Sequence, residues 1–180
     1  GLALLNCFNN LVQNRDREVS AILNVGDKNT TLAVMNKDGW PFIHDISSAG
    51  NDIIMQILSE NEISRKSLNS ILFHNAEDVS FDFMGSLEKA SDRLINGVSN
   101  ALRFYATQEK SVPVRKIYIC GGFATARGFI ELLSRRFGIE VVLWNPFTNI
   151  RCDASQECEE ILKKYGHTMA VAAGLAMRSI

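Results

Sequence analysis

Residues 20–46 hold three short strand-like runs, and their spacing limits the folds open to this chain. The runs are SAILNV (20–25), TLAVMN (31–36) and PFIHDI (41–46), each rich in aliphatic or aromatic residues. The turn NKDG (36–39) contains an Asp-Gly step, which favours a tight hairpin. Strands joined by short loops pair antiparallel, so the sequence predicts a three-stranded antiparallel meander.

The later strand-like runs are separated by long helical patterns. KIYIC (116–120) follows a periodic apolar stripe between Leu87 and Tyr105, and GIEVVLW (138–144) follows a predicted helix over 124–137. Parallel neighbours need such helical crossovers. We therefore predict an α/β fold of the ribonuclease-H-like type, a mixed five-stranded sheet with helices on both faces. Further helices are predicted over 2–13, 50–60 and 168–179, and a small variable insertion over 61–83.

Composition narrows the classes of function. The 180 residues include 19 basic and 20 acidic side chains, a net charge of −1, so we expect no nucleic-acid partner. Apolar residues make up 46% of the sequence, yet no apolar run approaches the roughly 18 residues of a membrane span. The first residues lack the basic region of a signal peptide. Because the sequence begins at Gly1 without a methionine, we expect a piece of a longer protein.

The cysteines and histidines indicate neither a metal site nor a disulfide framework. The four cysteines form no Cys-x-x-Cys pair, and the three histidines are scattered. Structural zinc requires closely spaced Cys and His ligands, so we expect no such centre. This usage favours a reducing, cytoplasmic compartment.

The loop between the first two strands is the first candidate binding element. In NVGDKNTT, from Asn24 to Thr31, Gly26 permits a tight turn, and amides and hydroxyls near Asn29 and Thr30 could bind phosphate oxygens. Lys28 could add positive charge. The same residue types are also the commonest in ordinary hairpin loops, so the loop alone leaves both interpretations open.

The second candidate element is YICGGFATARGFIELL, residues 118–133. A strand that runs through Gly121-Gly122 into a helix leaves free amides, which favour an anionic or hydrogen-bonding ligand. The missing side chains would also let a ring or sugar approach the backbone. A tight strand-to-helix turn explains the two glycines equally well.

Together, in this order, the two loops resemble the second half of the actin-like ATPase superfamily. The first resembles its second phosphate loop, an Asp-x-Gly-x-x-x-Thr pattern between strands, and the second resembles its adenosine loop, a Gly-Gly after a strand. A closer likeness is to the type IV pilus assembly protein PilM family. It rests on TTLAVMNKDG, ISSAGND, SNALRFY, IYICGGFATARGFIELL, NPF and VAAGLAMR, which occur in family order within residues 20–178.

The resemblance implies a cytoplasmic, two-lobed protein that binds ATP with Mg²⁺. This chain would be its C-terminal lobe, with the first lobe absent. The implied partner is a short cytoplasmic segment of a PilN-like inner-membrane protein, through which alone the protein would reach the membrane; self-association stays open. The resemblance places the nucleotide-contacting residues at Asn24, Gly26, Asp27, Lys28, Asn29, Thr30, Gly50, Asn51, Gly121, Gly122 and Ala124.

Three departures from the superfamily pattern favour binding over turnover. Asn24 stands where the superfamily has an acidic residue, and an amide adds no negative charge for Mg²⁺. Ala49 replaces a glycine, and the first lobe with its catalytic acid is missing from the sequence. We therefore predict a nucleotide-binding scaffold with little or no ATPase activity. The alternatives are a nucleotide-independent interaction module and, with less support, an active ATPase or a sugar-kinase-like phosphotransferase.

Overall fold

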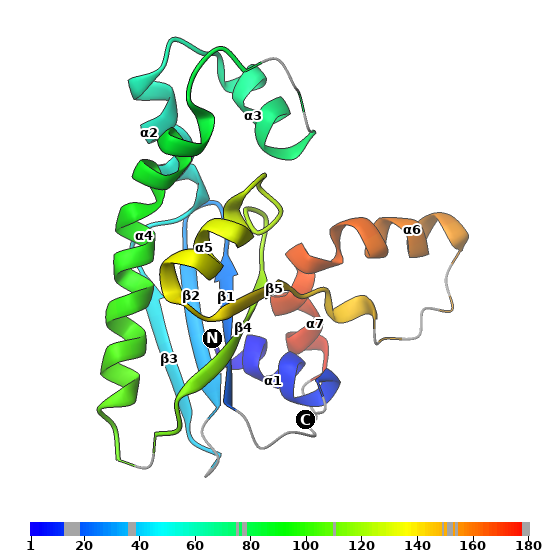
Figure 1. Cartoon of the computed structure of the whole chain (residues 1–180). Helices are drawn as coiled ribbons and strands as arrows, with labels where there is room; N and C mark the ends of the chain where they lie inside the picture. The colour runs from blue at the N-terminus through cyan, green and yellow to red at the C-terminus, as the bar shows by residue number, and fades with distance from the viewer. Residues whose placement is uncertain are drawn as a thin grey trace.

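The computed structural model describes the chain except for residues 13–18, 36–38, 75, 77–78, 110, 149, 151–152, 154 and 178–180. A five-stranded sheet with the order β3-β2-β1-β4-β5 forms its centre (Figure 1). The strands are β1 Val19–Val25, β2 Thr30–Met35, β3 Pro41–Ile46, β4 Val114–Cys120 and β5 Glu140–Leu143.

Strand pairing follows the connections. The first three strands pair antiparallel, and β4 lies parallel to both β1 and β5. The predicted mixed five-stranded sheet and its meander are therefore confirmed. The Asp-Gly turn itself lies, apart from Gly39, outside the described residues, as do Cys152 and the end of the predicted terminal helix.

Helices cover both faces of the sheet, as predicted. They are α1 Leu2–Leu11, α2 Gly50–Glu60, α3 Arg65–Phe73, α4 Phe83–Ala106, α5 Phe129–Phe137, α6 Gln156–Tyr165 and α7 Ala170–Ala176, with short 3-10 turns η1 Pro146–Thr148 and η2 Gly166–Met169. Alternate side chains of β1 enter different cores: Leu23 packs with α2, α4 and α5, and Ile22 packs with α1 and α7. No described helix is both long and apolar enough to span a membrane.

Three segments differ from the prediction. The helix predicted from residue 124 begins at Phe129, because turns occupy residues 121–128 and Gly128 has a left-handed φ of 73°. The predicted insertion contains α3, whose Ser64 cap accepts a hydrogen bond from the Ser67 amide. α6 was missed because none of its residues is buried, so it carries no apolar stripe against the core; Figure 1 shows it extending away from the sheet.

Candidate functional site

The two candidate loops lie side by side because β1 and β4 are parallel neighbours. Asn24 is aligned with Cys120 in this pairing, so both strands end at the same edge of the sheet. Just beyond it, the Phe123 amide donates a hydrogen bond to the Val25 carbonyl over 3.1 Å. The ends of β1 and β4, 96 residues apart in sequence, thus form one continuous edge of the sheet.

The β1–β2 turn also holds the start of α2. The Gly26 amide donates to the Asn29 carbonyl at 3.0 Å, which closes the turn. The Gly26 carbonyl accepts from the Gly50 amide at 3.0 Å, and the Asp27 carbonyl accepts from the Asn51 amide at 2.8 Å. Two of the amides that usually remain free at a helix start are therefore already bonded, so they cannot bind a ligand.

A pocket of about 280 Å³ opens at this junction. Its wall combines the β1–β2 turn, the start of α2, the Gly-Gly segment and α3. The lining residues are Gly26, Asp27, Gly50, Ile54, Arg65, Asn69, Phe73, Gly122 and Phe123.

Arg65 is the cation of this pocket. It is an exposed residue in the first turn of α3, and its guanidinium donates to the Asn51 side-chain oxygen at 2.8 Å. No described carboxylate forms an ion pair with Arg65, so its charge remains available to an anion. Our sequence interpretation missed this residue. The signal that could have found it is Ser64 preceding a basic residue, a helix start inside the supposed insertion.

A second pocket, of about 370 Å³, adjoins the first. Gly122 and Phe73 line both pockets, so they form the partition between them. The second pocket adds hydroxyl groups and ring faces to the charged end of the first. Its lining is completed by His74, Thr125, Lys164, Tyr165, His167 and Thr168.

The two adjacent glycines have different surroundings, so a side chain would have a different effect at each. Gly121 has a φ of 98°, and a side chain there would collide with the Val25 carbonyl and approach the Asn24 amide oxygen to 2.6 Å. A Cβ on Gly122 would meet nothing within 4 Å. Gly121 therefore serves the turn, and Gly122 faces open space between the two pockets.

Comparison with known proteins identifies the family. Residues 2–180 match the family model for the type IV pilus assembly protein PilM. The chain belongs to this family. No curated protein sequence matches it significantly.

Solved structures agree with the PilM assignment in their fold. The PilM-PilN type IV pilus biogenesis complex matches with a TM-score of 0.71 and 22% identity, over 98% of this chain and 50% of that one. The ethanolamine utilization protein EutJ of Carboxydothermus hydrogenoformans gives 0.63 and 17%, over 98% and 53%. The activator of the 2-hydroxyisocaproyl-CoA dehydratase of Clostridium difficile, with bound ADPNP, gives 0.51 and 13%, over 98% and 66%.

These matches confirm the actin-like fold of the PilM-family chain. The chain spans about half the length of the PilM and EutJ structures that it resembles. Its nucleotide-contacting residues stay predictions. The pockets divide them into residues that line a pocket and residues that do not.

Four of the predicted residues in the PilM-family chain line the first pocket: Gly26, Asp27, Gly50 and Gly122. The fifth, Asn51, reaches its edge through the hydrogen bond with Arg65.

Five other predicted residues line neither pocket. Lys28 and Asn29 are exposed on the turn, whereas Thr30 and Ala124 are completely buried. Within the described part of the chain, the Thr30 hydroxyl has no hydrogen-bond partner. Gly121 lies behind the wall, where its amide donates to the His167 carbonyl at 2.9 Å.

Asn24 of the PilM-family chain lines neither pocket. Its amide oxygen accepts a weak hydrogen bond from the Cys120 thiol at 3.7 Å and lies beside Gly121. Burial raises the pKa of the Cys120 thiol, so this thiol stays protonated and can donate. Among the described residues, no group of three His, Cys, Asp or Glu side chains could hold a metal ion.

The Asn-Pro-Phe motif of the PilM-family chain holds the end of α6, which carries a residue of the second pocket. The Asn145 side chain donates to the carbonyls of Leu162 and Lys163 at 2.9 and 3.0 Å, and its oxygen accepts from the Phe147 amide at 3.0 Å. The motif thereby fixes the end of α6, and with it the position of Tyr165.

Proposed function

We propose that this chain is the nucleotide-binding lobe of a PilM-family scaffold. The observation that carries the proposal is the junction of two pockets at Gly122. The first contains an arginine that forms no ion pair with a described carboxylate, and the second contains ring faces. A nucleotide has matching parts, since its phosphates pair with a guanidinium and its base packs on apolar and aromatic surface. The C. difficile activator, which shares the fold, carries bound ADPNP.

The residues present fit ATP, with a single carboxylate available for its metal ion. Arg65 would hold a phosphate in the first pocket, and Phe73 and Tyr165 would flank the base in the second. The part of the nucleotide between base and phosphates would lie against the Gly122 backbone, which lines both pockets. Asp27 is the acidic side chain of the first pocket. Mg²⁺ is often bound by one or two carboxylates together with substrate phosphates, so Asp27 would serve the ion and Asn24 would not. Bound Mg²⁺ would neutralise phosphate charge.

Turnover is not part of the proposal. Among the described residues that line the two pockets, Asp27 is the single acidic one. A single carboxylate next to phosphates supports binding of the metal ion, whereas hydrolysis also needs a group that positions or activates water. We therefore expect tight positioning of nucleotide with slow or absent hydrolysis.

The proposed partner is a short cytoplasmic segment of a PilN-like inner-membrane protein. The family assignment and the solved PilM-PilN complex support it. In this proposal the chain is the second of two lobes, works on the cytoplasmic side of the type IV pilus platform, and reaches the membrane through its partner. A bound nucleotide would hold the two lobes together and so form the surface that binds the PilN-like segment.

One observation favours a nucleotide-independent module instead. The amides of Gly50 and Asn51, which could otherwise cradle a phosphate, are bonded to the carbonyls of Gly26 and Asp27. In that case the same loops would stabilise the fold, and partner binding would not respond to ATP. This is the second candidate function.

Calorimetric titration of the full-length protein with an ATP analogue and Mg²⁺ distinguishes the two. We expect binding that Gly122→Val abolishes, because a branched side chain at the shared wall would fill the path between the pockets. Thermal unfolding of the Gly122→Val variant at the parent's temperature controls for a general loss of structure, because Gly122 is not among the glycines with a positive φ. Binding of a PilN-like peptide without any binding of nucleotide would support the module.

A further inference from the structure

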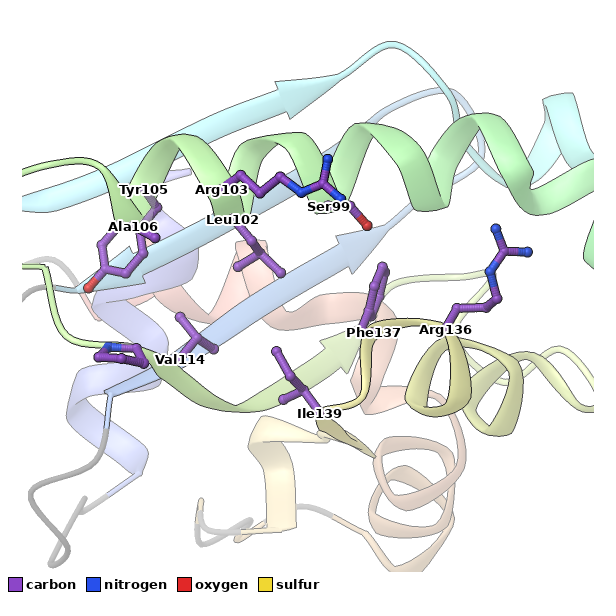
Figure 2. Close-up of a pocket in the computed structure, with 10 residues that line it drawn as sticks. Ser99, Leu102, Arg103, Tyr105, Ala106, Val114, Arg136, Phe137 and Ile139 are labelled. Carbon is purple, nitrogen blue, oxygen red and sulfur yellow. The ribbon is translucent and has the colours of Figure 1, made fainter.

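An apolar trough lies at the other end of β4, away from the two pockets. It has a volume of about 350 Å³ and runs between the last turns of α4, the start of β4 and the α5–β5 connection (Figure 2). Its lining residues are Ser99, Leu102, Arg103, Tyr105, Ala106, Pro113, Val114, Arg136, Phe137 and Ile139.

Interactions on both sides hold the walls of the trough in place. Glu88 of α4 pairs with Arg135 at 2.6 Å and with Arg136 at 3.2 Å, which fixes α5 against α4. On the other side, the buried Tyr105 is hydrogen bonded to the backbone of Val112, which fixes the approach to β4. The trough is therefore formed before any ligand arrives, so little ordering entropy opposes binding.

The floor of the trough is apolar and half-exposed. Leu102, Val114, Phe137 and Ile139 are each partly accessible, and Figure 2 shows their side chains directed into the space between α4 and the opposite wall. Covering such surface removes apolar area from water, which favours an apolar occupant.

The unneutralised charge at the trough is positive. None of the ten lining residues is acidic. Arg136 is neutralised by Glu88 and Asp92, whereas Arg103 is exposed and no described residue pairs with it. A carboxylate placed beside apolar groups would therefore complement the trough in both charge and polarity.

We propose that this trough binds a short segment of a partner polypeptide in which an Asp or Glu lies next to apolar side chains. The carboxylate pairs with Arg103, and the apolar side chains cover Leu102, Phe137 and Ile139. An extended or helical segment fits because exposed Ala106 and Pro113 leave the trough open at the end of α4. The proposal stands apart from nucleotide binding, since the seven residues of β4 separate the trough from Gly122.

Selection from a displayed library of random peptides on the full-length protein tests this proposal. We expect enrichment of peptides with an acidic residue beside Leu, Ile, Val or Phe. A labelled consensus peptide should then lose about tenfold in affinity, measured by fluorescence anisotropy, with Arg103→Glu, because a charge-assisted hydrogen bond is lost and a repulsion is added. ATP should leave this affinity unchanged.

Matched variants separate the trough from a general loss of structure. Ala106→Phe places a ring in the open end without disturbing a buried site, and it should also weaken peptide binding. Arg93→Glu and Asn100→Phe change exposed residues of α4 outside the trough, and both should bind as the parent protein does.

Three results would overturn the proposal. Enriched peptides without acidic residues would remove the role of Arg103, and equal binding by the Arg103→Glu and Ala106→Phe variants would place the peptide elsewhere. A dimer in light scattering that Ala106→Phe dissociates would show that a second copy of the chain occupies the trough instead.

Discussion

The two sides of the Gly-Gly segment differ in what their atoms already contact. On the inner side, Gly121 is pressed against the Asn24 side chain and the Val25 carbonyl. On the outer side, Gly122 lines both pockets and Arg65 lines the first. Glycines next to one another in a loop therefore need not share a role: one is required by packing, and the other leaves space. Substitutions on the inner side should affect folding, and those on the outer side should affect ligand binding.

Gly121→Ala should have the largest effect. Alanine must adopt a φ of 98° and place its Cβ against the Val25 carbonyl. Backbone strain and overpacking each cost about 1–3 kcal/mol, so we expect a loss of roughly 3 kcal/mol in the free energy of unfolding. Denaturant unfolding followed by circular dichroism measures it.

Gly122→Ala is the matched control for this prediction. Because nothing lies within 4 Å of its Cβ position, it should change the free energy of unfolding by less than about 0.5 kcal/mol. Similar destabilisation by the two alanines would remove the distinction between the inner and outer sides.

Arg65→Gln tests the outer side. The variant keeps a hydrogen-bonding side chain but loses the charge, and a hydrogen bond to a charged group contributes about 1.5–3 kcal/mol. We expect ATP binding by the full-length protein to weaken by roughly ten- to a hundredfold, with unchanged thermal unfolding, in calorimetric titrations. Lys66→Gln removes the neighbouring charge, which lines neither pocket, and should bind normally. Equal losses in both variants would mean a general effect of charge.

Gly50→Ala tests packing at the start of α2, because Gly50 lines the first pocket and is also pressed against Phe123. A Cβ there would lie 2.7–2.8 Å from the Phe123 side chain, including its Cβ, which cannot swing away. Alanine favours a helix by up to about 1 kcal/mol over glycine, so the net loss in unfolding free energy should be about 1–2 kcal/mol. The double variant with Phe123→Leu should recover part of this loss. No recovery would mean that the contact with Phe123 is not the cause.

Sequence patterns predicted the fold more completely than the site, for physical reasons. Hairpin turns and apolar periodicity are local, so residues 20–46 and the Leu87–Tyr105 stripe predicted their elements correctly. Gly122 could be recognised as part of a strand–Gly-Gly turn. Arg65 could not be placed, because its position in the pocket depends on how α3 folds back over α2. The bonding of the α2 amides by the β1–β2 turn is equally non-local.

The smallest effect is expected from pH, through His167, which lines the second pocket and supports Gly121 through its carbonyl. Burial lowers the pKa of His167 from its ordinary 6.5, and its carbonyl accepts the Gly121 amide. The unfolded chain therefore binds a proton at a higher pH than the folded chain does. The contribution of His167 to stability is complete above pH 6.5 and is lost as the pH falls below it.

Unfolding free energies of the parent and a His167→Gln variant between about pH 7.5 and pH 5.5 measure this contribution. The slope due to one proton cannot exceed about 1.4 kcal/mol per pH unit, and we expect the parent to lose more stability than the variant on acidification. Because His167 supports Gly121 through its backbone, the variant should keep that hydrogen bond, so any difference reports the ring alone. Parallel pH profiles for the two proteins would show that the ring does not titrate differently on folding.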